Sequence, residues 1–158
     1  MIATAPPADR VMADAARFVG GAPMVAHNAS FDRRFWAAEL GRLGGTQQAY
    51  PSPQPSPQSG EGVREFACTM LLSRRLYPEA RSFRLGSLAA FHDLPSSGRA
   101  HRAMADADVA AALLARIQRD LERRYDVFDC SHELLVKVGK APKKKVPEAI
   151  RKWVERGA

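Results

Sequence analysis

Apolar residues recur every three to four positions along several stretches of this chain, which is the spacing of an amphipathic helix. The longest stretch carries Val109, Leu113 and Ile117 on one face and predicts a helix that ends near residue 124. Shorter stretches end at glycine or before proline, as helices commonly do. They predict a first helix that follows Pro6-Pro7 and runs to about residue 19, helices over residues 31–43, 70–76 and 85–91, and a last helix that begins at Pro147.

Two hydroxyl side chains stand immediately before predicted helices. Ser30 precedes the pattern of residues 31–43, and Thr69 precedes that of residues 70–76. A hydroxyl at this position accepts a hydrogen bond from the first free backbone N–H groups of a helix. We therefore expect Ser30 and Thr69 to be N-caps.

Two short apolar runs, residues 22–27 and 64–68, predict strands. The first lies between glycines and a polar break and is too short for a helix. The pattern thus predicts several helices and two candidate strands.

The composition narrows the classes of partner. The net charge is +7, which favours an anionic partner, with nucleic acid ahead of a membrane surface. No apolar run approaches the length of a membrane span, and the N-terminus lacks a secretory pattern. Cys68 and Cys130 are isolated, which excludes a disulfide framework or a cysteine zinc site and favours the reducing cytoplasm.

Two further segments differ from the rest in composition. Residues 50–62 contain the tetrad Pro-Ser-Pro-Gln twice, at 51–54 and 55–58, and predict an insertion in a surface loop, with a peptide-recognition ligand as the alternative. Residues 125–158 predict a basic helical C-terminal extension in which 139–145 form a loop. Its lysines are either a solvated face or phosphate contacts.

The candidate chemistry lies where the long helix begins. His101 precedes Asp106 by five residues, and positions five apart on a helix point in different directions. The two can serve one site only if His101 lies on the incoming loop and Asp106 in the first turns. An imidazole beside a carboxylate suits metal-assisted hydrolysis. The alternative is a surface histidine and an acidic residue favoured by the helix dipole.

Two segments together resemble the DEDDh 3′–5′ exonucleases, the family of the proofreading epsilon subunit of DNA polymerase III. Residues 25–32, VAHNASFD, resemble its second motif, and residues 101–107, HRAMADA, resemble its third, H-x-A-x-x-D-A. The sequences FACTML at 66–71 and LGSL at 85–88 also fit, although many members have Asp-Thr where this chain has Cys68-Thr69. The resemblance covers roughly residues 8–120.

This resemblance implies a ribonuclease H-like fold and hydrolysis of phosphodiester bonds with two Mg²⁺ or Mn²⁺ ions. Asp106 would bind a metal ion directly, Asp32 would hold the second ion partly through water, and His101 would be the general base. His27 and Asn28 would support the turn from strand to helix. The implied partners are single-strand 3′ ends of nucleic acid, DNA first, and a DNA polymerase subunit.

The family's first motif, Asp-x-Glu, lies on a strand well upstream of the second motif, which here begins near residue 25. We therefore expect this chain to start after the first motif, as a protein with a misplaced start would. Asp120-Leu121-Glu122 has the pattern but lies within the long predicted helix, where residues two apart face different ways. With two of four carboxylates, we expect little or no nuclease activity.

The resemblance then implies that residues 1–124 are a partial exonuclease domain of the α/β class. We expect a helix-dominated remnant with about two strands of a five-stranded mixed sheet. We expect its helices to lose packing surface at Phe18, Trp36, Leu113 and Ile117 and to promote self-association. Two other functions remain open. One is a non-catalytic nucleic-acid-binding or polymerase-associated module that uses the basic extension, and the other is a non-functional fragment.

Overall fold

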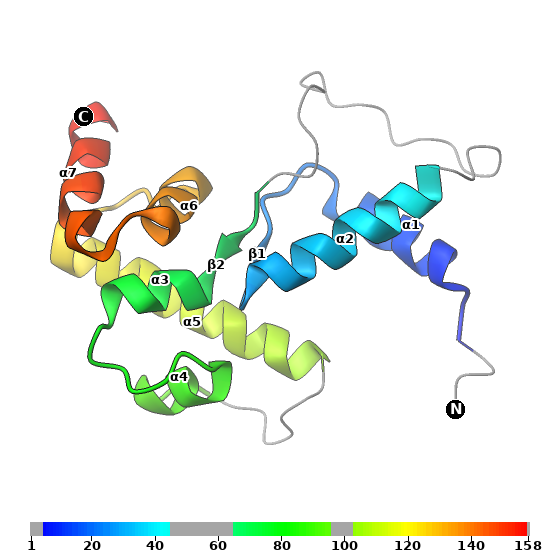
Figure 1. Cartoon of the computed structure of the whole chain (residues 1–158), viewed down its shortest axis with the longest axis horizontal. Helices are drawn as coiled ribbons and strands as arrows, with labels where there is room; N and C mark the ends of the chain where they lie inside the picture. The colour runs from blue at the N-terminus through cyan, green and yellow to red at the C-terminus, as the bar shows by residue number, and fades with distance from the viewer. Residues whose placement is uncertain (1–4, 45–64, 96–102, 158) are drawn as a thin grey trace. The chain divides into compact units, whose positions relative to one another are not determined.

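The computed structural model describes residues 5–44, 65–95 and 103–157, so the repeated tetrads and His101 lie outside the described residues. The chain divides into two compact units (Figure 1). The first unit comprises residues 1–24 and 30–65, and the second comprises residues 25–29 and 66–158. Across the described helices, none is long and apolar enough to cross a membrane.

The described elements are mostly helices, as the hydrophobic pattern predicts. In chain order they are α1 (Ala8–Val19), β1 (Val25–Ala26), α2 (Ala29–Gly44), β2 (Ala67–Cys68), α3 (Thr69–Leu76), α4 (Leu85–Phe91), α5 (Ala103–Tyr125), α6 (His132–Lys140), the 3₁₀ turn η1 (Lys143–Lys145) and α7 (Val146–Gly157).

The sheet of the second unit consists of β1 and β2, which pair in parallel. Val25 lies opposite Ala67, and Ala26 lies opposite Cys68. Both strands are shorter than the apolar runs that predicted them. This confirms the predicted helix-dominated α/β class with about two strands.

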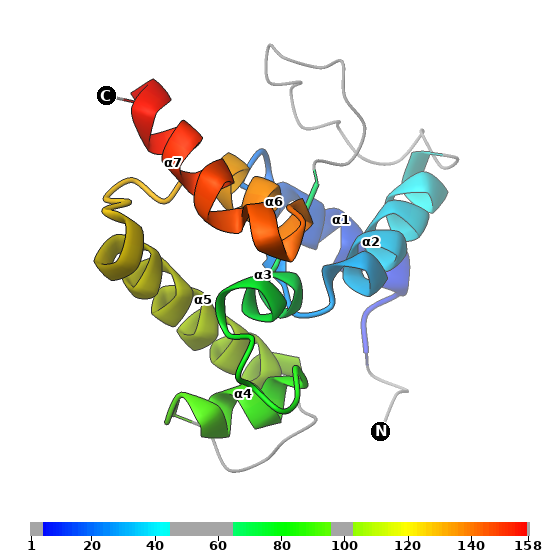
Figure 2. The same ribbon diagram turned by 60° about the vertical axis from the view of Figure 1, so that its left-hand side comes forward.

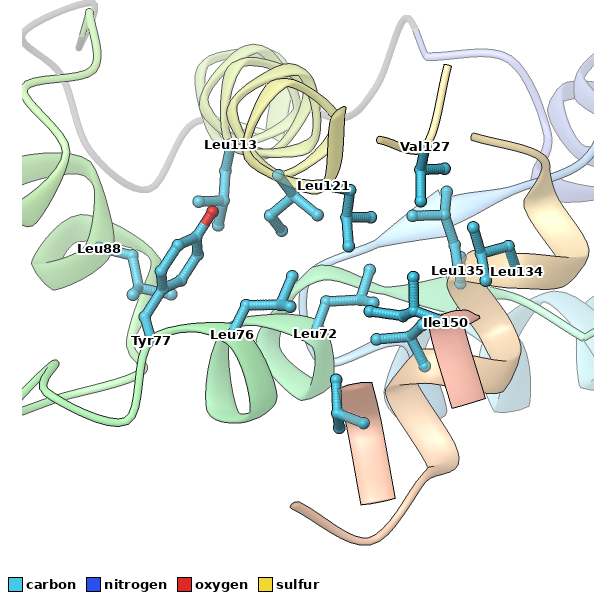
Figure 3. Packing of buried hydrophobic residues seen from close by; sticks show 14 of the residues in the cluster. Leu72, Leu76, Tyr77, Leu88, Leu113, Leu121, Val127, Leu134, Leu135 and Ile150 are labelled. Carbon is cyan, nitrogen blue, oxygen red and sulfur yellow. The ribbon is translucent and has the colours of Figure 1, made fainter. Parts of the chain in front are cut away.

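One hydrophobic core fills the second unit, and α5 runs along it (Figure 3). Leu113, Ile117 and Leu121 of α5 are fully buried. The expectation that Leu113 and Ile117 lose their packing surface is therefore wrong. Helices α3, α4 and α7 all contact α5, so these side chains pack without a large sheet.

The C-terminal helices belong to this core. Helix α6 packs against α3 and β2, and α7 packs against α6 and α5 (Figure 2). Leu134, Val138 and Ile150 are fully buried there. The predicted loop over 139–145 is wrong in part, because Gly139 is buried at the end of α6 and residues 143–145 form η1.

The first unit has a different character. Its helix α1 has no buried residue, and Phe18 is 92% exposed, as expected. Phe31 and Phe35 of α2 are exposed and lie against each other, with ring centroids 4.8 Å apart. Trp36 is half-buried, so the expected loss of packing is only partial at that position.

Neither predicted N-cap has that role. Helix α2 begins at Ala29, so Ser30 lies inside it. Thr69 is the first residue of α3, and Cys68 holds the cap position without a side-chain hydrogen bond. The Thr69 hydroxyl is fully buried and lies 2.9 Å from the imidazole of His27, so a tertiary partner replaces the local one.

Candidate active site

His27 follows β1 and connects three segments of the second unit. Its Nε2 lies 2.9 Å from the Phe83 carbonyl oxygen, and its Nδ1 lies 2.9 Å from Thr69 Oγ1. Because a carbonyl oxygen only accepts, Nε2 donates to Phe83, and Nδ1 faces the Thr69 hydroxyl, which also lies 3.5 Å from the Ala26 carbonyl oxygen. The imidazole therefore joins the end of β1 to the start of α3 and to the loop before α4. This agrees with the supporting role expected for His27.

Asn28 makes the turn between β1 and α2. Its φ is 67°, in the left-handed region that asparagine tolerates better than most residues. The next residue, Ala29, is only 3% exposed and starts α2. The segment 25–29 thus anchors the beginning of α2 in the second unit, as expected for a strand-to-helix turn.

Asp32 and Asp106 occupy equivalent places on their helices. Asp32 lies in the first turn of α2 and is exposed, and Asp106 lies in the first turn of α5 and is half-buried. A carboxylate in a first turn is stabilised by the partial positive charge of the helix N-terminus. Asp106 precedes the buried Val109 by three residues, so it lies toward the packed side of α5. The expectation that Asp106 belongs to the first turns is confirmed.

The third predicted site residue, His101, is outside the described residues. Asp32 belongs to the first unit and Asp106 to the second, whose relative position is not determined. The assembly of Asp32, His101 and Asp106 into one site therefore stays a prediction.

A divalent cation would need a cluster of oxygen donors. Mg²⁺ and Mn²⁺ bind several oxygen ligands at once. Within residues 5–44, 65–95 and 103–157, no three histidine, cysteine, aspartate or glutamate side chains gather closely enough to hold a metal ion.

The one Asp-x-Glu sequence has a structural role. Asp120 is buried, and its Oδ2 accepts from the Tyr77 hydroxyl at 2.8 Å and from Arg116 Nε at 2.9 Å. Burial raises the pKa of Asp120, but the hydrogen bonds from Arg116 and Tyr77 outweigh it and hold the pKa below its usual value. Glu122 is exposed. The two carboxylates face different ways, which confirms the rejection of this pair.

Two more ionisable groups surround this buried aspartate. Burial and the hydrogen bond to Asp120 raise the pKa of Tyr77. His92 packs edge-on against the Tyr77 ring, with centroids 4.3 Å apart, and burial and then the nearby Arg116 lower its pKa. The sequence analysis missed this cluster. The spacing of Arg116 and Asp120, four apart on a helix, was its one local signal.

Comparison with known proteins defines the class of this chain. Residues 1–114 match the sequence model of the RNase T exonucleases. The chain belongs to this exonuclease family, whose members use divalent metal ions.

Individual relatives agree with this assignment. A PolC-type DNA polymerase III of Halalkalibacterium halodurans is 31% identical over 124 residues, which are 78% of this chain and 8% of that protein. A putative bifunctional exonuclease/endonuclease protein of Mycobacterium tuberculosis is 37% identical over 123 residues, 74% of this chain and 17% of that protein. The chain thus spans less than a fifth of the length of either relative. No solved structure matches it.

Proposed function

We propose that this chain contributes to a 3′–5′ exonuclease of the epsilon type, which removes nucleotides from single-strand 3′ ends of DNA. The observation that carries the proposal is the family match over residues 1–114, which includes the helix start where Asp106 lies. The equivalent position of Asp32 in the first turn of α2 supports it.

In this proposal Asp106 and Asp32 are the metal-binding carboxylates, His101 is the general base, and the cofactor is Mg²⁺ or Mn²⁺. Two carboxylates are few for two ions, which prefer several carboxylate oxygens each. We therefore expect weak cleavage by this chain. The proposal places the protein in the cytoplasm, where its two free cysteines would stay reduced.

The test is degradation of single-strand DNA labelled at one end, with Mn²⁺ and with Mg²⁺. Asp106→Asn should abolish cleavage from the 3′ end. The matched control is Asp108→Asn, because Asp108 lies two residues further along α5 and is exposed. Equal activity in wild type and in both variants would contradict the assigned role of Asp106. Loss in both variants would point to a general effect of charge near the helix start.

A second function is a non-catalytic module associated with nucleic acid or with a polymerase. The exposed basic residues of η1 and α7 favour it, and the relatives of the PolC type supply the polymerase context. Metal-independent DNA binding without any cleavage would support this alternative. Cleavage that requires Asp106 would exclude it.

A further inference from the structure

The positive charge of the chain is concentrated after the segment that matches the exonuclease family. Residues 131–158 hold eight lysines and arginines against three glutamates, whereas the whole 158-residue chain has a net charge of +7. Helices α6 and α7 and the turn η1 lie entirely within this segment. Most of the net charge is therefore carried by a short part of the chain.

The lysine turn, Lys143, Lys144 and Lys145, is the densest part of this charge. All three side chains are exposed, and none forms an ion pair with another residue that the structure describes. Their ammonium groups are therefore available to an external anion.

The lysine turn is held at both ends. Before it, the Ala141 carbonyl oxygen accepts a hydrogen bond of 3.2 Å from Arg75 Nε of α3. After it, Val146 is 2% exposed and Ile150 is fully buried in the core. Within it, the Lys145 N–H donates to the Pro142 carbonyl oxygen at 2.8 Å. A solvated tail needs no such anchoring, and a fixed turn loses less conformational entropy when it binds.

The positive surface continues along α7. Arg151, Lys152 and Arg156 are exposed there. Lys152 donates to Glu148 at 2.7 Å, and this bond holds the pKa of Glu148 below its usual value. One of the few acidic side chains of this surface is thus already paired within the helix.

We propose that the lysine turn and the adjoining basic residues of α7 bind the phosphate backbone of a nucleic acid strand, independently of its sequence. Closely spaced exposed ammonium groups match a polymer that carries a phosphate at each nucleotide, and displaced counterions add to the affinity. This proposal rests on the proposed function in one respect, which is that the partner is a nucleic acid. It adds a binding surface outside residues 1–114 for nucleotides on the 5′ side of the 3′ end at which the proposed exonuclease acts.

The experiment measures fluorescence anisotropy of labelled oligodeoxythymidylate and of oligouridylate of the same length, with the full chain in EDTA. The charge-removing variant carries Lys143→Gln, Lys144→Gln and Lys145→Gln. The matched control carries Arg81→Gln, Arg119→Gln and Arg123→Gln, which removes the same charge from other exposed positions. A third variant with Lys→Arg at 143–145 keeps the charge. Circular dichroism checks that all of them fold.

We expect the Lys→Gln variant to bind about tenfold or more weakly at ~0.1 M salt, with the slope of log K against log salt smaller by about 2, since each single-strand phosphate contact contributes about 0.7. The control and the Lys→Arg variant should bind like wild type. Equal weakening in the control would show a general charge effect and overturn the proposal. Competition by polyglutamate as strong as that by DNA would assign the surface to an acidic protein instead.

The oligouridylate arm separates RNA from DNA without affecting the proposal, since both polymers carry the same phosphates. Because EDTA prevents metal-dependent cleavage, this binding is measured separately from the exonuclease reaction. Loss of cleavage in Asp106→Asn with intact binding would leave both proposals standing. Intact cleavage with no effect of the lysine substitutions on binding would overturn this one alone.

Discussion

The two units of this chain differ in how far their amphipathic helices bury their apolar residues. Helices α1 and α5 both have regularly spaced apolar residues, but α1 buries none of them, whereas α5 buries Leu113, Ile117 and Leu121 completely. The difference comes from what surrounds each helix. Helix α5 contacts three other helices of its unit, while the described residues of the first unit include no buried side chain. An amphipathic face specifies a helix, but burial requires a complementary surface.

The sharpest test of this comparison replaces one large apolar residue in each unit. Leu113→Ala should lower the free energy of unfolding by about 3 kcal/mol, because it leaves a cavity in the core. Phe18→Ala should change it by less than about 0.5 kcal/mol, because the ring is 92% exposed. Urea unfolding followed by circular dichroism measures both. A large cost for Phe18→Ala would show that α1 is packed in solution.

The buried carboxylate allows a similar test within α5. Asp120→Asn should cost about 2 kcal/mol, since it removes the charge that Arg116 and Tyr77 stabilise. Glu122→Gln on the exposed side of the same helix is the control and should be nearly neutral. Comparable costs for both would mean that the interactions of the Asp120 charge with Arg116 and Tyr77 add nothing to stability.

Acid should act on the second unit through the same cluster. Burial and Arg116 hold the pKa of His92 below 6.5, so the unfolded chain takes up this proton first and stability falls as the pH drops below about 6.5. The lowered pKa of Asp120 adds to the loss below about 3.8. Urea midpoints at several pH values measure the fall, and His92→Gln should flatten it between pH 7 and 5. An unchanged profile in this variant would exclude His92 as the cause.

Helix caps give the smallest expected difference. Ser131 accepts from the Leu134 N–H at 3.3 Å at the start of α6, so Ser131→Ala should cost about 1 kcal/mol. Ser30 lies inside α2, and Ser30→Ala should be neutral or slightly stabilising because alanine favours helix. The melting temperatures of the two variants measure this difference in stability. A cost at Ser30 equal to that at Ser131 would restore Ser30 as a cap.

Local patterns predict the helices well because their periodicity and their boundaries are local properties. They locate α1, α4 and the end of α5 within a residue or two. The burial of Leu113 and the partner of Thr69 depend on residues far along the chain, in α3 and α4 and at His27, and no local signal indicates them. The same limit holds for the candidate site. Spacing predicts Asp106 in a first turn, but spacing alone does not determine how far it lies from Asp32.

The second unit is formed by two separate parts of the chain, and the length of the connection between them can vary. Residues 25–29 supply β1, and the rest of that unit resumes at residue 66. The segment 30–65 joins the two parts and returns Ala67 and Cys68 to their register beside Val25 and Ala26. The entropic cost of closing such a connection grows slowly, by roughly 0.6 kcal/mol for each doubling of its length. Tandem copies of Pro-Ser-Pro-Gln can therefore be gained or lost between the strands with little effect on the core, so this segment is where related chains are expected to differ most in length.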